Sequence, residues 1–343
     1  MFFASDNASS APPEVMAALN AANADYAMPY GNDAIMRRAR DQIRETFAAP
    51  DAAVYLVATG TAANALSLAL FCPPWGAVLC HEHAHIAEDE CGAPEFYTAG
   101  AKLALVAGAH GKMTPDTLTA RLAQFSDANV HGVQRGMLSI TNVTEAGTVY
   151  TPTEVAALTA IARTAGMPSH MDGARFANAV VATGSTPAEM TWQAGIDVLS
   201  FGGTKNGLLG VEAVVIFDPS RAWEFELRRK RAGHLFSKHR YLSAQMNAYL
   251  TDGLWLQLAA GANAMATRLA QGLARVPGSV LMHPVQANML FPEWPAETHE
   301  RGRAAGAVFY DWAGGDGRKA ARLVTSWSTT EKDVDRFLAA ISG

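Results

Sequence analysis

Short apolar runs recur along the first two-thirds of the chain, and each is bounded by polar residues, glycine or proline. Continuous apolar runs of about four to eight residues that are rich in β-branched side chains are typical of buried strands. The pattern predicts seven such strands, at residues 53–57, 77–80, 103–106, 137–141, 168–171, 198–201 and 213–217.

Helical segments separate several of these strands. Thr151 and Glu154 have the spacing of a capping box, Pro152 suits the first helical position, and Gly166 follows the last turn. Strands that alternate with helices predict an α/β domain with a mostly parallel seven-stranded sheet. In such sheets ligands bind beyond the carboxyl ends of the strands, so the loops that follow the strands are the places to look for chemistry.

The pattern changes near residue 221, where long helices are predicted at 221–231, 241–258 and 261–273. Short strands are predicted at 279–283, 288–291 and 322–327, followed by a last helix capped by Ser328 and Glu331. We therefore expect residues 1–240 to form a large α/β domain, whose N-terminal segment contributes to the active site. Residues 241–343 are expected to form a small α+β domain.

Composition excludes several classes of protein. The 343 residues are 49% hydrophobic and 17% charged, with a net charge of −5, which excludes disorder and a strongly basic surface for nucleic acid. Apolar runs fall far short of the roughly 20 residues that cross a bilayer, and residues 1–13 lack the pattern of a secretory signal. We expect a soluble cytoplasmic protein whose three cysteines are buried and reduced.

Thr59, Gly60 and Thr61 follow the first strand and begin an alanine-rich helix. A helix start offers free N–H groups and the positive end of the helix dipole to a phosphate. Capping threonines and turn glycines are common, so an ordinary helix start is the alternative interpretation.

His81, His83 and His85 alternate after the second strand, and on an extended chain they would point the same way. That spacing raises the possibility of a metal site and of a metal-dependent hydrolase. Such a centre needs further ligands at later strand ends, where the sequence places Asp172 and Lys205 without a histidine beside them. We expect no metal, and a helix over this segment would leave one histidine facing a cleft.

Asp172 ends the fifth strand, with Arg175 in the following turn, and Lys205 lies in a glycine-rich loop after the sixth strand. A lysine, a carboxylate and a helix start at neighbouring strand ends suit pyridoxal phosphate. The lysine forms a Schiff base with the aldehyde, the carboxylate keeps the pyridine nitrogen protonated, and the helix start holds the phosphate. A solvated loop lysine is the alternative reading of Lys205 alone.

The segments around these residues, HMDGAR from His170 and GGTKNG from Gly202, resemble the threonine aldolases. These are pyridoxal-phosphate enzymes with the aspartate-aminotransferase fold, and the resemblance is greatest to the low-specificity L-threonine aldolases. It extends from Ser5 to about Trp327. The chain departs from the usual family pattern at residues 141–144, which read TNVT, and at Asn206.

The resemblance implies roles for residues throughout the chain. Catalytic roles fall on Lys205, His85, His131 and Asp172. Cofactor-binding roles fall on Thr59, Gly60, Thr61, His85, Asp172, Arg175, Thr204, Lys205 and Lys230. Substrate-binding roles fall on Ser5, Asn7, Tyr30, Arg175 and Arg322.

Some of these roles are more specific. His85 matches the histidine that stacks on the cofactor ring, Glu90 matches the glutamate after it, and His131 matches a histidine near the substrate hydroxyl. Tyr30 and Lys230, and less closely Lys238, match residues that complete the site of a neighbouring subunit, so the resemblance implies a homodimer or homotetramer.

The activity implied is retro-aldol cleavage of L-threonine, L-allo-threonine or a related β-hydroxy-α-amino acid such as phenylserine, giving glycine and an aldehyde. A β-eliminating lyase or aminotransferase on the same fold is the nearest alternative. A module that binds the cofactor without catalysis is another.

Overall fold

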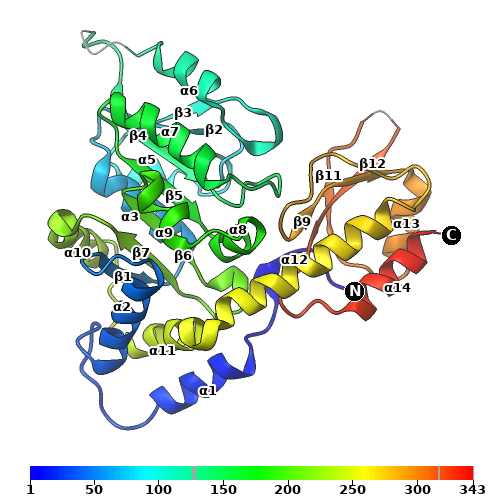
Figure 1. The fold of residues 1–343 in the computed structure, drawn as a ribbon, viewed down its shortest axis with the longest axis horizontal. Coiled ribbons are helices and arrows are strands. Elements are labelled where there is room, and N and C mark those ends of the chain that lie inside the picture. The colour runs from blue at the N-terminus through cyan, green and yellow to red at the C-terminus, as the bar shows by residue number, and fades with distance from the viewer. Residues whose placement is uncertain (126–128, 316, 343) are drawn as a thin grey trace.

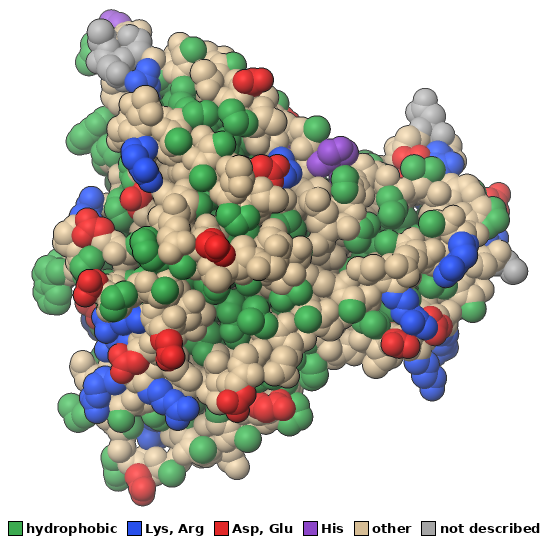
Figure 2. Space-filling model, in the orientation of Figure 1, with side chains coloured by type: hydrophobic (Ala, Val, Ile, Leu, Met, Phe, Trp, Pro, Cys, Tyr) green, Lys and Arg blue, Asp and Glu red, His purple; other side chains and the backbone are tan. Residues whose placement is uncertain are grey.

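The computed structural model describes residues 1–125, 129–315 and 317–342. Two sheets of unequal size form two lobes, and the long helix α12 (Leu254–Leu273) runs from one lobe to the other (Figure 1). Figure 2 shows Lys and Arg side chains interspersed with Asp and Glu over one face of both lobes.

The larger sheet has the strand order β1-β7-β6-β5-β4-β2-β3. Its strands are β1 Ala53–Val57, β2 Gly76–His81, β3 Lys102–Val106, β4 Gln134–Thr141, β5 Ser169–Gly173, β6 Val198–Gly202 and β7 Glu212–Ile216. All seven predicted strands are thus confirmed, with differences of a few residues at their ends. Strands β2 to β6 pair in parallel, whereas β7 is antiparallel to both β1 and β6, so the sheet is mostly parallel as predicted.

Helices cover both faces of this sheet, which explains why its strands are continuous apolar runs. On one face the buried side chains pack with those of α3 (Gly60–Phe71) and α10 (Ala222–Arg231). The other face packs mainly against α2 (Ala34–Thr46), α6 (Pro115–Leu122), α7 (Pro152–Thr164), α8 (Phe176–Thr183) and α11 (Arg240–Leu250). The predicted capping box of α7 is confirmed: the side chains of Thr151 and Glu154 each accept from the other residue's backbone N–H.

The smaller sheet has five strands of the C-terminal region. They are β8 Val280–Leu281, β9 Met289–Leu290, β10 Pro292–Trp294, β11 Tyr310–Trp312 and β12 Lys319–Val324. The helices α13 (Ala296–Ala304) and α14 (Glu331–Ser342) pack on it, with a core that includes Trp294 and Phe337. β10, β11 and α13 are additions to the predicted elements. The division at residue 240 stays a prediction.

Three predicted helix boundaries are wrong. The predicted helix 241–258 is interrupted at Thr251–Gly253, because Asp252 and Gly253 adopt positive φ angles of 53° and 70°. The expected break before Gly261 does not occur, because that glycine lies inside α12. The last helix is capped by Thr330 rather than Ser328, since the Thr330 hydroxyl accepts from the Asp333 backbone N–H at 3.2 Å.

Four further helices have four to ten residues each. They are α1 Pro13–Ala22, α4 His85–Glu88, α5 Ala93–Tyr97 and α9 Pro187–Met190. Cys72 and Cys80 are buried as expected, but Cys91 is exposed, so the expectation was wrong for that residue. Among the described residues, none of the helices combines the length and the apolar character needed to cross a membrane.

Candidate active site

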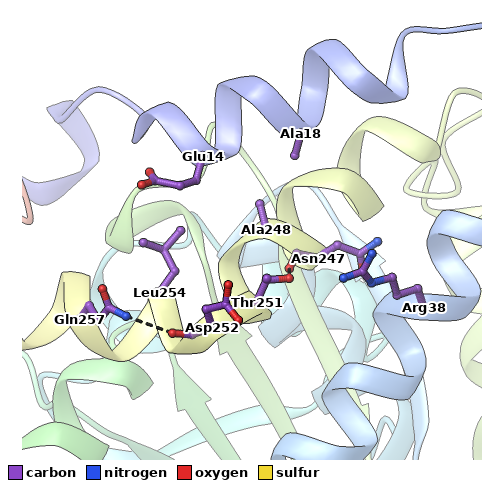
Figure 3. Close-up of a pocket in the computed structure, with 9 residues that line it drawn as sticks. All are labelled: Glu14, Ala18, Arg38, Asn247, Ala248, Thr251, Asp252, Leu254 and Gln257. Atoms are coloured by element: carbon purple, nitrogen blue, oxygen red, sulfur yellow. Dashed lines mark hydrogen bonds between the residues drawn. The ribbon is translucent and has the colours of Figure 1, made fainter.

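A cavity of about 230 Å³ lies where β1, β5 and β6 end and brings most of the predicted site residues together. Its lining includes the predicted residues Asn7, Thr59, Gly60, Thr61, His85, Asp172, Thr204 and Lys205. Larger hollows lie elsewhere. The one in Figure 3, between α1, α2, α11 and α12, has a volume of about 390 Å³, but none of its nine labelled lining residues is lysine or histidine.

The start of α3 forms one wall of the cavity. The Thr59 side chain caps the helix by accepting from the Ala62 N–H at 3.2 Å. A side-chain Cβ added at Gly60 would meet no atom within 4 Å, so the backbone there faces open space. An open helix N-terminus with hydroxyls on both sides of the glycine fits a phosphate group.

Asp172 lines the cavity at the end of β5. Its Oδ1 accepts from the Ala174 N–H at 3.0 Å, and its Oδ2 accepts from the Asn64 side chain at 2.9 Å. The same amide nitrogen of Asn64 donates to Glu90 Oε1 at 2.8 Å. Asn64 therefore holds two buried carboxylates together. The sequence offered one signal for it, a polar residue within the otherwise apolar α3.

His85 is the histidine of the HEHAH segment that lines the cavity. Its Nδ1 lies 2.8 Å from Glu90 Oε1, and this hydrogen bond raises the pKa of His85 although burial opposes the shift. Burial raises the pKa of Glu90. His81 instead contacts the Gly108 carbonyl, and His83 pairs with Glu88, so only one of the three histidines lines the cavity, as expected. The predicted helix is too long, because α4 covers only His85–Glu88.

The donor atoms of His85, Glu90 and Asp172 lie within 4.8 Å of one another, close enough for a metal ion. Internal hydrogen bonds account for this grouping. His85 pairs with Glu90, and Asn64 bridges Glu90 to Asp172.

Lys205 lies in the short helical turn Thr204–Asn206 that follows β6. The Thr204 hydroxyl accepts from the Val211 N–H at 3.2 Å. Asn206, at the point where the chain departs from the family pattern, donates to the Tyr249 hydroxyl and to the Trp255 carbonyl, both at 2.8 Å. The lysine is therefore presented by a turn that is anchored on both sides.

The N-terminal segment and two arginines extend the site. Asp6 accepts from Arg175 Nε at 2.6 Å and from Arg175 Nη2 at 2.9 Å. Burial alone would raise the pKa of Asp6, but the charge and hydrogen bonds of Arg175, together with Lys205 and Asn288, outweigh it and the pKa is lowered. Ser5 caps the turn before Asn7, and Arg322 contacts the Ala4 carbonyl at 3.5 Å.

Arg322 suits an anionic ligand. Its Nε is buried and makes no hydrogen bond within the described part of the chain. Burial lowers the pKa of Arg322, and the nearby charge of Arg175 contributes in the same direction. Two guanidinium groups that repel each other would be stabilised by a carboxylate between them.

Besides Ser5, Arg175 and Arg322, the predicted residues His131, Tyr30, Lys230 and Lys238 also lie outside the lining of this cavity. His131 is exposed and precedes β4, whereas the cavity lies beyond the carboxyl ends of the strands. Tyr30 and Lys230 lie together, with the lysine Nζ 5.2 Å from the ring centroid, and the Tyr30 N–H donates to the Ser237 carbonyl beside Lys238. Their roles in the active site stay predictions, which require that these residues reach the cavity of a second chain.

The residues present fit pyridoxal phosphate. The open start of α3 suits its phosphate, the buried Asp172 suits its ring nitrogen, and Lys205 suits its aldehyde. These three groups reach one cavity from three different segments of the chain.

Comparisons with known proteins agree with this geometry. The model of the β-eliminating lyase family matches residues 3–294. A low specificity L-threonine aldolase from a Pseudomonas species is 43% identical over 339 residues, covering 99% of this chain and 96% of the relative. A protein of the same name from Pseudomonas aeruginosa is 43% identical over 334 residues, covering 97% and 94%.

Among solved structures, threonine aldolase from Leishmania major superposes with a TM-score of 0.93 at 29% identity, covering 99% of this chain and 98% of that one. A serine palmitoyltransferase from Sphingomonas wittichii shares the fold alone, with a TM-score of 0.71 at 13% identity over 100% and 86% of the two chains. The chain therefore belongs to the β-eliminating lyase family and is a carbon–carbon lyase of the threonine aldolase type.

Proposed function

We propose that this chain, with pyridoxal phosphate, cleaves L-threonine, L-allo-threonine or a related β-hydroxy-α-amino acid such as phenylserine to glycine and an aldehyde. The observation that carries the proposal is the shared cavity of Lys205, Asp172 and the α3 start. Relatives named low specificity L-threonine aldolase, 43% identical over nearly the whole chain, support the same reaction.

When bound, pyridoxal phosphate supplies an aldehyde that condenses with amines and a ring that accepts the electrons of the breaking bond. The chain must decide which bond breaks. Arg175 and Arg322 are proposed to bind the substrate carboxylate and so to orient the Cα–Cβ bond for cleavage. Each charge-assisted contact of this kind contributes roughly 1.5–3 kcal/mol.

A base must also remove the proton of the β-hydroxyl group. His85 is the candidate within this cavity, because Glu90 holds its Nδ1 and leaves Nε2 for the substrate side. A positioned base of this kind contributes roughly 10²–10⁴ in rate. His131 is the second candidate, and it would act from a neighbouring subunit.

We propose a homodimer or homotetramer with shared active sites. The position of Tyr30 and Lys230 outside the lining of their own chain's cavity supports this assembly. Sedimentation of the purified protein tests it, and a monomer that cleaves threonine at full rate would contradict it. The cytoplasmic location is likewise proposed, and cell fractionation tests it.

The test of the reaction is release of glycine and aldehyde from L-threonine, L-allo-threonine and L-phenylserine by purified protein with pyridoxal phosphate. Equal amounts of both products establish the aldolase and rank its substrates. Keto acid without aldehyde would establish β-elimination or transamination instead. If neither aldehyde nor keto acid forms, the chain is a module that binds the cofactor without catalysis. If a chelator abolishes the activity, the enzyme depends on a metal.

A further inference from the structure

Glu212 is a buried carboxylic acid at the start of β7, and neither the predicted site nor the proposed reaction uses it. Its exposed fraction is 6%, and its neighbours along the chain, Val211 and Ala213, are fully buried. Burying a carboxylate without partners is strongly unfavourable, so its partners indicate what it does.

The register of the sheet places Glu212 between two functional loops. In the β1–β7 pair it lies opposite Val57, the last residue of β1 before the Thr59–Thr61 helix start. In the β6–β7 pair it lies opposite Gly202, the last residue of β6 before the Lys205 turn. Its side chain also lines the cavity that these loops enclose.

Glu212 contacts the lysine turn directly. Its Oε2 accepts from the Gly203 N–H at 2.7 Å, and its carboxylate also accepts from the Thr204 hydroxyl. The turn packs closely against the strand, because a Cβ on Gly203 would come within 2.7 Å of the Val211 carbonyl oxygen. The two residues before Lys205 are therefore fixed by one buried carboxylate.

We propose that Glu212 is a positioning residue that fixes the Gly203–Thr204 backbone and so aims the Lys205 amine at the cofactor aldehyde. The inference rests on the proposed function, since it assigns a role within that site. The step it assists is attack of the amine on the aldehyde carbon, which forms a carbon–nitrogen double bond and releases one water.

The surroundings of Glu212 also act on its charge. The charged groups that act on its carboxyl are Lys205 after β6 and Asp172 at the end of β5. Burial raises the pKa of Glu212 to about 7, with the Thr204 and Gly203 hydrogen bonds and Lys205 opposing the shift. The contacts to the lysine turn therefore favour the negative form of this carboxyl.

Asp197 supplies a matched control. Its Oδ2 accepts from the Ser169 N–H at 2.7 Å, and burial raises its pKa, but it lies at the amino ends of β5 and β6, away from the cavity. Asp197→Asn thus loses a similar carboxylate–amide contact in the same sheet.

The experiment mixes apoprotein with pyridoxal phosphate and traps the attached cofactor with borohydride at timed intervals. Mass spectrometry of the Lys205 peptide gives the attachment rate, and dialysis gives the dissociation constant. We expect Glu212→Ala to slow attachment at least about tenfold, the factor for losing one hydrogen bond to a charged group. Glu212→Gln keeps an acceptor for Gly203 and recovers most of the rate. Asp197→Asn matches the unaltered protein in both the attachment rate and the dissociation constant.

Attachment by Glu212→Ala at the unaltered rate, or equal slowing by Asp197→Asn, would overturn the positioning role. If Glu212→Ala does not fold, Glu212→Asp decides, because its shorter side chain cannot hold the Gly203 N–H in the same place, and attachment at the unaltered rate overturns the inference. Aldehyde release by the unaltered protein separates the two proposals. If the unaltered protein cleaves threonine and the Glu212 variants attach the cofactor at the normal rate, only the role of Glu212 is refuted. If the unaltered protein does not attach the cofactor, the proposed function is refuted as well.

Discussion

Replacing Asp6 with asparagine should destabilise the protein, because it leaves the Arg175 guanidinium buried without its counter-ion. The side chains of Arg175 and Asp6 are only 4% and 1% exposed. Breaking such a pair from one side costs about 3–5 kcal/mol. With an unfolding entropy of about 2.1 cal/mol/K per residue over the 343 residues, this corresponds to a fall of roughly 4–7 °C in the thermal midpoint.

The effect should depend on pH in a defined direction. Because the pKa of Asp6 is lowered in the folded protein, its pairing stabilises the fold above the ordinary carboxyl pKa. That contribution is lost as the pH falls through the folded value. Asp6→Asn should therefore show its full cost at pH 7 and a smaller cost below about pH 4.

The assay is thermal unfolding followed by circular dichroism, with Asp335→Asn as the control. Asp335 also accepts from both Nε and Nη2 of an arginine, Arg268, at 2.9 and 2.8 Å, but the two side chains are 55% and 40% exposed. Exposed pairs contribute little, so we expect no resolvable shift for this variant. Equal midpoints for Asp6→Asn and Asp335→Asn would refute the reasoning from burial.

Four other predictions follow from the site. Lys205→Ala should abolish release of glycine and aldehyde while keeping the thermal midpoint, and normal cleavage would refute the mechanism. Arg322→Ala should raise KM for threonine about 10–100-fold with a smaller change in kcat, as expected for one lost charge-assisted contact; an unchanged KM would contradict the carboxylate role. Glu90→Gln should lower the pKa of His85 and move the acid limb of the rate–pH profile to lower pH, and an unmoved limb would exclude His85 as the base. Burial lowers the pKa of His170 to about 4, so between about pH 4 and 6.5 the unfolded chain binds more protons at this residue than the folded protein does. The free energy of unfolding should therefore fall by about 2 kcal/mol from pH 7 to pH 5 on account of His170. In chemical unfolding at these two pH values, His170→Gln should lack this part of the pH dependence.

The larger sheet could be predicted from the sequence because its strands, apart from the partly exposed edge strand β3, are buried on both faces. Each therefore reads as one apolar run, whichever way its neighbours are arranged. The small lobe was harder to predict. Strands β8 to β11 are two or three residues long, and they depend on pairing partners such as β12 rather than on local pattern.

The strand-end residues of the site, Asp172 and Lys205, were also predictable, because parallel strands bring their carboxyl ends to one edge. Asn64, Asp6 and Glu212 were not predicted as partners. The contacts of Asn64 and Asp6 join segments far apart in the sequence, whereas Glu212 contacts Gly203 only nine positions away, across the β6–β7 pair. The Asn64–Asp172 hydrogen bond spans 108 positions and the Asp6–Arg175 pair spans 169. Asn64 and Glu212 did carry one usable signal, because each is a polar residue within a buried apolar element.

The attachment of the first residues to the C-terminal lobe has a consequence for biosynthesis. The Phe3 N–H donates to the Val308 carbonyl at 2.7 Å, and the Val324 N–H donates to the Phe3 carbonyl at 2.8 Å. About 300 residues separate these partners, so the ribosome must release nearly the whole chain before Asp6 can be held beside Arg175. Nascent chains should therefore complete the large sheet before the substrate-binding end of the site, and a fusion placed directly before Met1 should disturb the site more than one placed after α14.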